Sequence, residues 1–218
     1  MKTVDINKIY QVLKKEVRKY KVPVIELIEA QTKDPFKVLV GTILSARTKD
    51  EVTAKAASRL FKTARNPDDF EKLTIKHIEK LIYPVGFYKN KAKFLKELPI
   101  ALKEKFGGII PQSVDELTKL PGVGRKTANL VVAVAFNKPA ICVDTHVHKI
   151  VNRWGYVKTK SPLETEMALR RKLPKKYWKT LNTFLVAFGQ HLCTPVSPHC
   201  SKCPIREYCN KVGVGKSR

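Results

Sequence analysis

Apolar residues recur at three- and four-residue steps along most of this chain, and this spacing is the feature that most limits how it can fold. Residues 6–20 carry one such stripe, and residues 94–102 repeat it. Side chains at these intervals lie on one face of an α-helix, so each stripe predicts a helix packed against a core. Pairs that contain Pro or Gly interrupt the stripes at intervals that suit helices and are long for hairpins. We therefore predict an all-α fold.

Residues 131–136 could form either kind of element, because they are rich in the β-branched side chains that strands prefer. Gly122 and Gly124 precede this stretch, and the apolar segment as a whole is long for a strand. Both observations favour a buried helix that begins after the glycines.

The charge of the chain restricts its partners. It has 43 Lys and Arg against 19 Asp and Glu in 218 residues, a formal net charge of +24, and its 43% of apolar residues is typical of a globular protein. There is no run of 18 apolar residues and no apolar signal segment at the N-terminus, so we expect neither a membrane span nor secretion. Thermophilic proteins gain Lys and Glu together, whereas acidic residues are scarce here. The excess of cations therefore favours nucleic acid as the partner.

Four of the five cysteines lie within 17 residues of one another near the C-terminus. The four are Cys193, Cys200, Cys203 and Cys209. A reducing compartment disfavours disulfides, so thiolates this close together indicate either a structural zinc ion or a [4Fe–4S] cluster. Zinc sites usually have two short-spaced pairs of ligands, and only one such pair is present, which favours the cluster. The fifth, Cys142, lies in an apolar run and is expected to be a core thiol.

Two glycines separated by one residue open a predicted helix in the segment 120–126. Gly122 and Gly124 would leave backbone N–H groups accessible, and Arg125 follows them directly, so this helix N-terminus suits a phosphate group. The segment lacks the full glycine pattern of a dinucleotide-binding loop or a P-loop, which makes a DNA backbone phosphate the better candidate. An ordinary tight turn between two helices is the alternative.

Two charged residues near this segment could take part in chemistry. Lys126 lies in the first turn of the predicted helix, an unfavourable place for a cation, and it is either a nucleophile or a phosphate-binding lysine. Asp144 precedes another amphipathic stretch and is a good helix N-cap, which alone could explain it. His146 could help to fix Asp144 or a phosphate.

Together these residues resemble the endonuclease III family of DNA glycosylases. The likeness rests on residues 120–154 and the four-cysteine array, and it extends to residues 44–50 and 86–92. The resemblance implies two helical domains. A six-helix barrel with a helix–hairpin–helix motif would comprise residues 28–138, and residues 1–27 and 139–218 would form a domain around a [4Fe–4S] cluster held by the four cysteines.

The resemblance also implies the reaction. Enzymes of this family extrude a damaged pyrimidine from duplex DNA and fill the gap with side chains, for which Arg47 and Phe87 stand at the matching positions. Many relatives carry Gln and an aliphatic residue there, so the preference for the opposing base does not carry over. Lys126 would attack C1′ of the sugar, and Asp144 would stabilise the developing positive charge. Gly122, Gly124, Arg125 and His146 would contact the DNA.

We accordingly expect a bifunctional DNA glycosylase and AP lyase that acts on duplex DNA with oxidised or saturated pyrimidines or abasic sites. We expect a monomer, associated with the nucleoid in a prokaryotic cytoplasm. Lys126 favours lyase activity, because adenine-mismatch glycosylases lack a lysine at this position and thymine-mismatch glycosylases often carry Tyr. The alternatives are a monofunctional mismatch glycosylase for adenine or thymine, and a non-enzymatic DNA-binding protein with a structural zinc ion.

Overall fold

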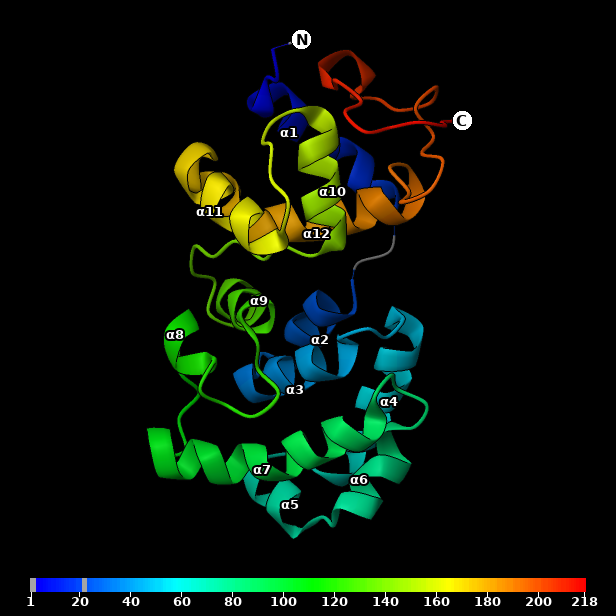
Figure 1. The fold of residues 1–218 in the computed structure, drawn as a ribbon. Coiled ribbons are helices and arrows are strands. Elements are labelled where there is room, and N and C mark those ends of the chain that lie inside the picture. Colours follow the sequence, from blue (N-terminus) through cyan, green and yellow to red (C-terminus); the bar gives the residue numbers. More distant parts are fainter. Residues whose placement is uncertain (1–2, 21–22) are drawn as a thin grey trace. The chain divides into compact units, whose positions relative to one another are not determined.

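A computed structural model describes residues 3–20 and 23–218 of the chain. Every regular element in these residues is helical, and none of them is a β-strand (Figure 1). The predicted all-α fold is confirmed. None of the described helices is both long and apolar enough to cross a membrane.

The chain divides into two compact units, which we name by their main features. The hairpin unit comprises residues 24–138, and the cysteine unit comprises the described residues up to 23 together with residues 139–218. The boundary predicted after residue 27 would cut helix α2 (Val24–Thr32), whereas this division keeps the whole helix in the hairpin unit.

Helix α3 (Pro35–Ser45) is the centre of the hairpin unit. Eight of its eleven residues are buried, from Phe36 to Leu44, as expected of a helix that is apolar on all sides. It packs against α2, α4, α7 and α9. The other helices of this unit are α4 (Asp50–Thr63), α5 (Pro67–Lys72), α6 (Ile75–Ile82), α7 (Tyr88–Phe106), α8 (Val114–Leu117) and α9 (Arg125–Ala135).

Short polar side chains set the beginnings of several of these helices. Asp34 accepts hydrogen bonds from the backbone N–H groups of Phe36 and Lys37, and Pro35 occupies the first turn, where it needs no hydrogen-bond partner. The ambiguous stretch 131–136 is helical up to Ala135, as the sequence favoured.

The cysteine unit joins the two ends of the described chain around one core. Its helices are α1 (Ile6–Glu16), α10 (Thr145–Trp154), α11 (Pro162–Lys172) and α12 (Trp178–His191), with the 3-10 helices η1 (Val17–Lys19), η2 (Lys175–Tyr177) and η3 (Arg206–Tyr208). Ile9 and Leu13 of α1 are fully buried in the same apolar cluster as Trp154 and Phe188. The Tyr10 hydroxyl donates to the carbonyl oxygen of Tyr177 at 2.8 Å, which links α1 to a segment 167 residues away.

Candidate functional site

The loop before α9 contains the two glycines of the predicted hairpin, and the first is required by the fold. Gly122 has a φ of +72°, in the left-handed region that favours glycine. A Cβ atom built on Gly122 would lie 2.8 Å from the ring of Phe94 in α7. Both the backbone conformation and the close packing therefore exclude a larger residue.

Gly124 is under a different constraint, because it is the N-cap of α9 with an ordinary φ of −85°. A Cβ atom on Gly124 would meet nothing within 4 Å, and no side chain caps this end of the helix. The exposed residues Arg125 and Lys126 follow as the first two residues of α9. The structure thus brings both glycines and both cations to one open helix N-terminus, which is suited to an anion.

Arg47 and Phe87 form a second exposed feature of the hairpin unit. Their side chains touch, with the Arg47 guanidinium carbon 5.4 Å from the centre of the Phe87 ring. Each has a left-handed backbone, with φ of +53° and +57°, which is uncommon for residues other than glycine. Both residues line a cavity of about 270 Å³ together with Phe94 and Gly122, so the predicted gap-filling residues lie beside the hairpin.

Asp144 is the N-cap of α10 and is half-buried. Its Oδ1 accepts a hydrogen bond of 2.8 Å from the backbone N–H of Val147, so the predicted capping role is seen directly. Its Oδ2 makes no hydrogen bond to any described residue and remains available to a ligand. One carboxylate can therefore both begin the helix and present an oxygen to a reacting group.

His146, the second residue of α10, packs against α12. A Cβ atom on Gly189 would lie 2.3 Å from Nδ1 of His146, so the imidazole occupies the space that a larger residue at 189 would need. No hydrogen bond joins His146 to Asp144 within the residues that the structure describes. The suggestion that His146 fixes this carboxylate therefore lacks support, whereas its DNA contact stays a prediction.

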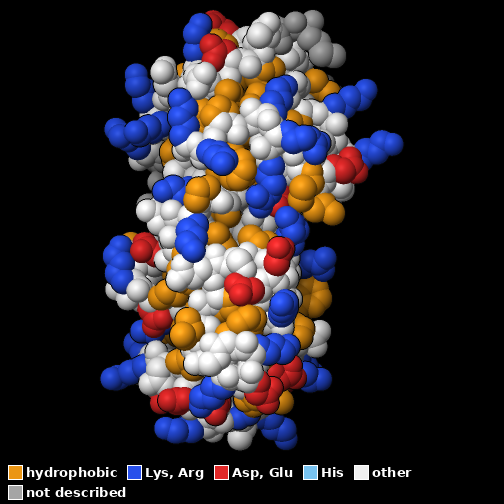
Figure 2. All heavy atoms as spheres, turned by 90° about the vertical axis from the view of Figure 1, so that its left-hand side faces the viewer, with side chains coloured by type: hydrophobic (Ala, Val, Ile, Leu, Met, Phe, Trp, Pro, Cys, Tyr) orange, Lys and Arg blue, Asp and Glu red, His pale blue; other side chains and the backbone are white. Residues whose placement is uncertain are grey.

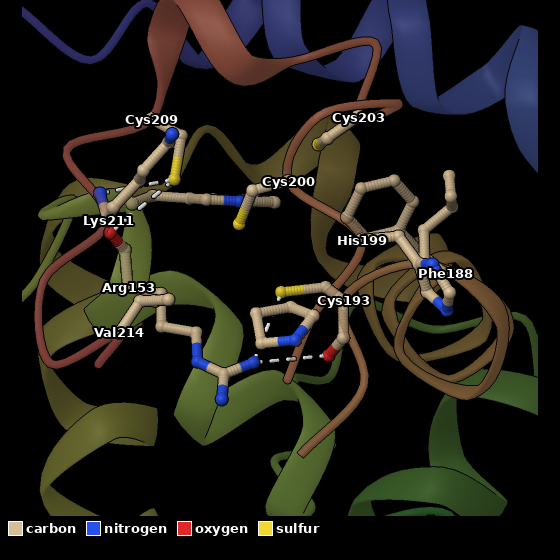
Figure 3. A pocket seen from close by; sticks show the side chains of 12 residues that line it. Arg153, Phe188, Cys193, His199, Cys200, Cys203, Cys209, Lys211 and Val214 are labelled. Atoms are coloured by element: carbon tan, nitrogen blue, oxygen red, sulfur yellow. Dashed lines mark hydrogen bonds between the residues drawn. The ribbon is translucent and has the colours of Figure 1, made fainter. Parts of the chain in front are cut away.

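The four clustered cysteines line one cavity of the cysteine unit (Figure 3). All are free thiols, and the sulfur atoms of Cys193, Cys200 and Cys209 turn toward the middle of the cavity. Cys142 is buried away from this cavity, as expected of a core thiol. Among the described residues, no three His, Cys, Asp or Glu side chains converge closely enough to hold a single metal ion.

The surroundings of the sulfur atoms favour a bound group with positive metal ions. Burial raises the pKa of Cys193 and Cys209, and it raises the pKa of Cys203 to about 12, so thiolates there need a compensating charge. Hydrogen-bond donors already point at two of them. The Arg153 guanidinium lies 3.4 Å from Sγ of Cys193, and the backbone N–H of Lys211 lies 3.4 Å from Sγ of Cys209. Soft thiolate ligands of this kind fit an iron–sulfur cluster or zinc.

Comparison with known proteins decides the family. The family model of the HhH-GPD superfamily of base excision DNA repair proteins matches residues 40–175, and that of the iron–sulfur binding domain of endonuclease III matches residues 193–209. Endonuclease III of Thermotoga maritima is 48% identical over 176 residues, which cover 81% of this chain and 83% of that protein. The chain belongs to the endonuclease III family.

Two solved structures of endonuclease III with DNA show that the similarity extends to the fold of the chain. A non-covalent endonuclease III–DNA complex has a TM-score of 0.84 at 36% identity and covers 94% of both chains. A trapped covalent endonuclease III–DNA intermediate has a TM-score of 0.77 at 40% identity and covers 82% of this chain and 84% of that one. The chain is therefore a DNA-binding enzyme of base excision repair, a bifunctional DNA glycosylase and AP lyase. Its cofactor is a [4Fe–4S] cluster, which sets aside the zinc alternative.

Two residues of this endonuclease III family member lie at the sites but were not predicted from the sequence. Arg153 of α10 donates hydrogen bonds to the carbonyl oxygens of Cys193, Thr194 and Pro195, at 3.3, 2.8 and 2.8 Å. Lys91 of α7 is buried beside Arg47, and burial lowers its pKa to about 8. Lys91 falls on the same helical face as the buried Leu95, which was the available signal. Arg153 had no comparable signal, because its partners are 40 or more residues away.

Proposed function

We propose that this enzyme removes oxidised or saturated pyrimidines from duplex DNA and then cleaves the strand at the resulting abasic site, with Lys126 as the nucleophile. The observation that carries this proposal is the position of Lys126, exposed in the first turn of α9 directly after the open glycine hairpin. A backbone phosphate held at this helix N-terminus would place a sugar of the same strand within reach of a lysine in the first turn.

The glycine hairpin, with Gly122 and Gly124, and the exposed pair of Arg47 and Phe87 have complementary tasks in this proposal. Gly124 and the N–H groups that follow it hold a phosphate, which positions the strand without reading its sequence. Phe87 enters the stack, and Arg47 donates hydrogen bonds to the base that has lost its partner. Extrusion costs a few kcal/mol and is least costly for a damaged base, which contributes to selectivity.

The covalent step balances with the groups present. The neutral amine of Lys126 attacks C1′, the glycosidic bond breaks with its electron pair on the departing base, and the base takes up a proton. The attached nitrogen loses one proton, and its lone pair then opens the sugar ring, whose oxygen O4′ takes up a proton, to give a protonated Schiff base. Removal of a proton from C2′ then expels the 3′ phosphate, and water releases the lysine. Asp144 stabilises the positive charge that develops on the sugar and assists the proton transfers.

The four cysteines Cys193, Cys200, Cys203 and Cys209 are the proposed ligands of the [4Fe–4S] cluster. When bound, the cluster supplies a rigid cross-link for residues 193–209, which form no helix longer than three residues. The chain's own residues prepare this site, since Arg153 and the N–H of Lys211 hold two of the sulfur atoms in place. We further propose that the enzyme acts as a monomer, and that it works on the nucleoid of a prokaryotic cytoplasm, where its substrate lies.

Borohydride trapping tests the proposed nucleophile. The wild-type enzyme, incubated with duplex DNA containing thymine glycol, should give a covalent protein–DNA adduct on reduction. Lys126→Gln should abolish the adduct and leave the affinity for the duplex nearly unchanged. Arg125→Gln is the matched control, because it removes the neighbouring charge and should weaken binding while trapping persists. Trapping that survives Lys126→Gln would refute the assignment.

Measurements of unfolding and of base excision separate the two roles of Asp144. Asn caps helices about as well as Asp, so Asp144→Asn should keep the free energy of unfolding within a few tenths of a kcal/mol while base excision slows strongly. An unchanged excision rate would restrict Asp144 to capping.

The substrate class is tested by measuring base release and strand nicking on duplexes that contain thymine glycol, oxidised cytosine or a mismatch. Release from mismatches alone would contradict the proposed class.

A further inference from the structure

A buried lysine lies directly behind the exposed pair formed by Arg47 and Phe87. Lys91 of α7 has only 5% of its surface exposed, although it is charged at neutral pH. Its Nζ donates to the carbonyl oxygen of Leu44 at 2.8 Å, to that of Ala46 at 2.6 Å and to the Thr48 hydroxyl at 3.2 Å. All three protons of the ammonium group therefore have acceptors.

These acceptors explain why a cation is tolerated at this position. Leu44 lies in the last turn of α3, and Ala46 is its C-cap. The last carbonyl groups of a helix lack partners within the helix and carry the negative end of its dipole. Lys91 supplies donors and a positive charge at that end. No carboxylate among the described residues contributes to its electrostatics.

The Thr48 hydroxyl connects this lysine to the segment that contains Phe87. It accepts a hydrogen bond from the backbone N–H of Gly86 at 3.1 Å and donates to the carbonyl oxygen of Ala46 at 3.3 Å. The two segments also touch directly, because a Cβ atom on Gly86 would lie 2.6 Å from the carbonyl oxygen of Arg47. Residues 46 and 86, which immediately precede the exposed pair, are thus joined through one hydroxyl and one ammonium group.

The exposed pair needs such support. A left-handed backbone is unfavourable for a residue other than glycine, and it persists where surrounding contacts hold it in place. Arg47 and Phe87 both have this conformation, and both side chains are exposed. Their own contact, a guanidinium beside a ring at an exposed site, is weak and cannot offset the cost of two such backbones.

We propose that Lys91 is a positioning residue, which acts with the Thr48 hydroxyl to fix Arg47 and Phe87 in the geometry that enters the DNA helix. The inference rests on the gap-filling role proposed above for Arg47 and Phe87. Preorganisation of the two side chains before DNA binds removes the ordering cost from the extrusion step.

A double-mutant cycle tests this inference. Lys91→Met should slow single-turnover excision of thymine glycol by about ten- to a hundredfold, as expected for misplaced positioning groups. In an Arg47→Ala/Phe87→Ala background the same substitution should cost about twofold or less, because the groups through which Lys91 acts are gone. An equal loss in both backgrounds would overturn the inference, since a purely structural lysine acts independently of these side chains.

A spectroscopic readout follows extrusion itself. The fluorescence of 2-aminopurine placed opposite the lesion rises when that base is unstacked. At saturating enzyme, Lys91→Met should reduce this rise, whereas Lys93→Met should leave it unchanged. Lys93 is the matched control, because it is an exposed lysine on the same helix. A full rise with Lys91→Met would also overturn the inference.

Two further measurements separate failure of the inference from misfolding of a variant and from failure of the proposed gap-filling function. If Lys91→Met fails to fold, Thr48→Val removes a single acceptor and should show the same dependence on Arg47 and Phe87. If the Arg47→Ala/Phe87→Ala protein excises at the wild-type rate, the proposed gap-filling function fails, and the inference falls with it. If that protein is slow but the cycle is additive, the inference alone fails.

Discussion

Gly122 has a left-handed backbone and no room for a Cβ beside Phe94, whereas Gly124 has an ordinary backbone and open space around it. Gly122→Ala should therefore lower the free energy of unfolding by about 1–3 kcal/mol. Gly124→Ala should leave stability nearly unchanged and weaken DNA binding, because the new methyl group would obstruct a phosphate at the N-terminus of α9. Urea unfolding and the Kd for an abasic duplex measure the two effects. Equal losses of stability would show that both glycines serve only the fold.

Single residues also show which features of the site could be predicted from the sequence alone. Gly122 could be anticipated, because a glycine pair that opens a helix is a local pattern. The left-handed backbone of Arg47 and Phe87 could not, since neither residue type favours it and the cause lies in contacts between residues about 40 apart. The position of Lys91 on the buried face of α7 was a local signal, but the acceptors that allow its burial could not be anticipated. Its acceptors are 43 to 47 residues away.

At the level of helices, apolar spacing predicted α1 and α7 because each buries one face against a core. Residues 131–136 form part of α9, and the predicted stripe over residues 6–20 begins as α1. That stripe continues as the 3-10 helix η1 after Glu16, a change that apolar spacing alone does not reveal. Helix caps such as Asp144 could be predicted from the sequence, because a cap lies next to its own helix. Hydrogen bonds between a helix and a distant segment could not be predicted in this way.

Helix α10 illustrates such a link, because it begins at Asp144 and carries Arg153 near its other end. Arg153 holds three consecutive carbonyl groups of the loop that starts at Cys193. Arg153→Met should therefore loosen this loop and speed the loss of the cluster. The visible absorbance of the cluster and the iron content after exposure to a chelator measure the rate. Lys149→Met, which removes an exposed cation of the same helix, is the control and should retain the cluster. Equal rates for both variants would contradict the role of Arg153.

On the scale of the whole molecule, the positive charge is unevenly shared. In the sequence, residues 1–23 and 139–218 together have 22 Lys and Arg against 6 Asp and Glu, whereas residues 24–138 have 21 against 13. Lys and Arg side chains are spread over the face drawn in Figure 2, and Asp and Glu side chains are fewer. Net charge alone thus indicates a polyanionic partner, while the reaction is indicated by a few residues such as Lys126.

Salt dependence of binding can separate the contacting charges from the rest. An enzyme that contacts about 6–10 phosphates should show a slope of about −5 to −9 for log K against log salt concentration. This slope is much less steep than the one expected if the full net charge of +24 contacted phosphates. Arg125→Gln should reduce the steepness by about one, because it removes one phosphate contact beside the hairpin, and Lys93→Gln should leave it unchanged. Fluorescence anisotropy with an undamaged duplex measures these slopes. A slope near the full charge would mean that binding is spread over the whole surface, and an unchanged slope for Arg125→Gln would remove the hairpin from the phosphate contacts.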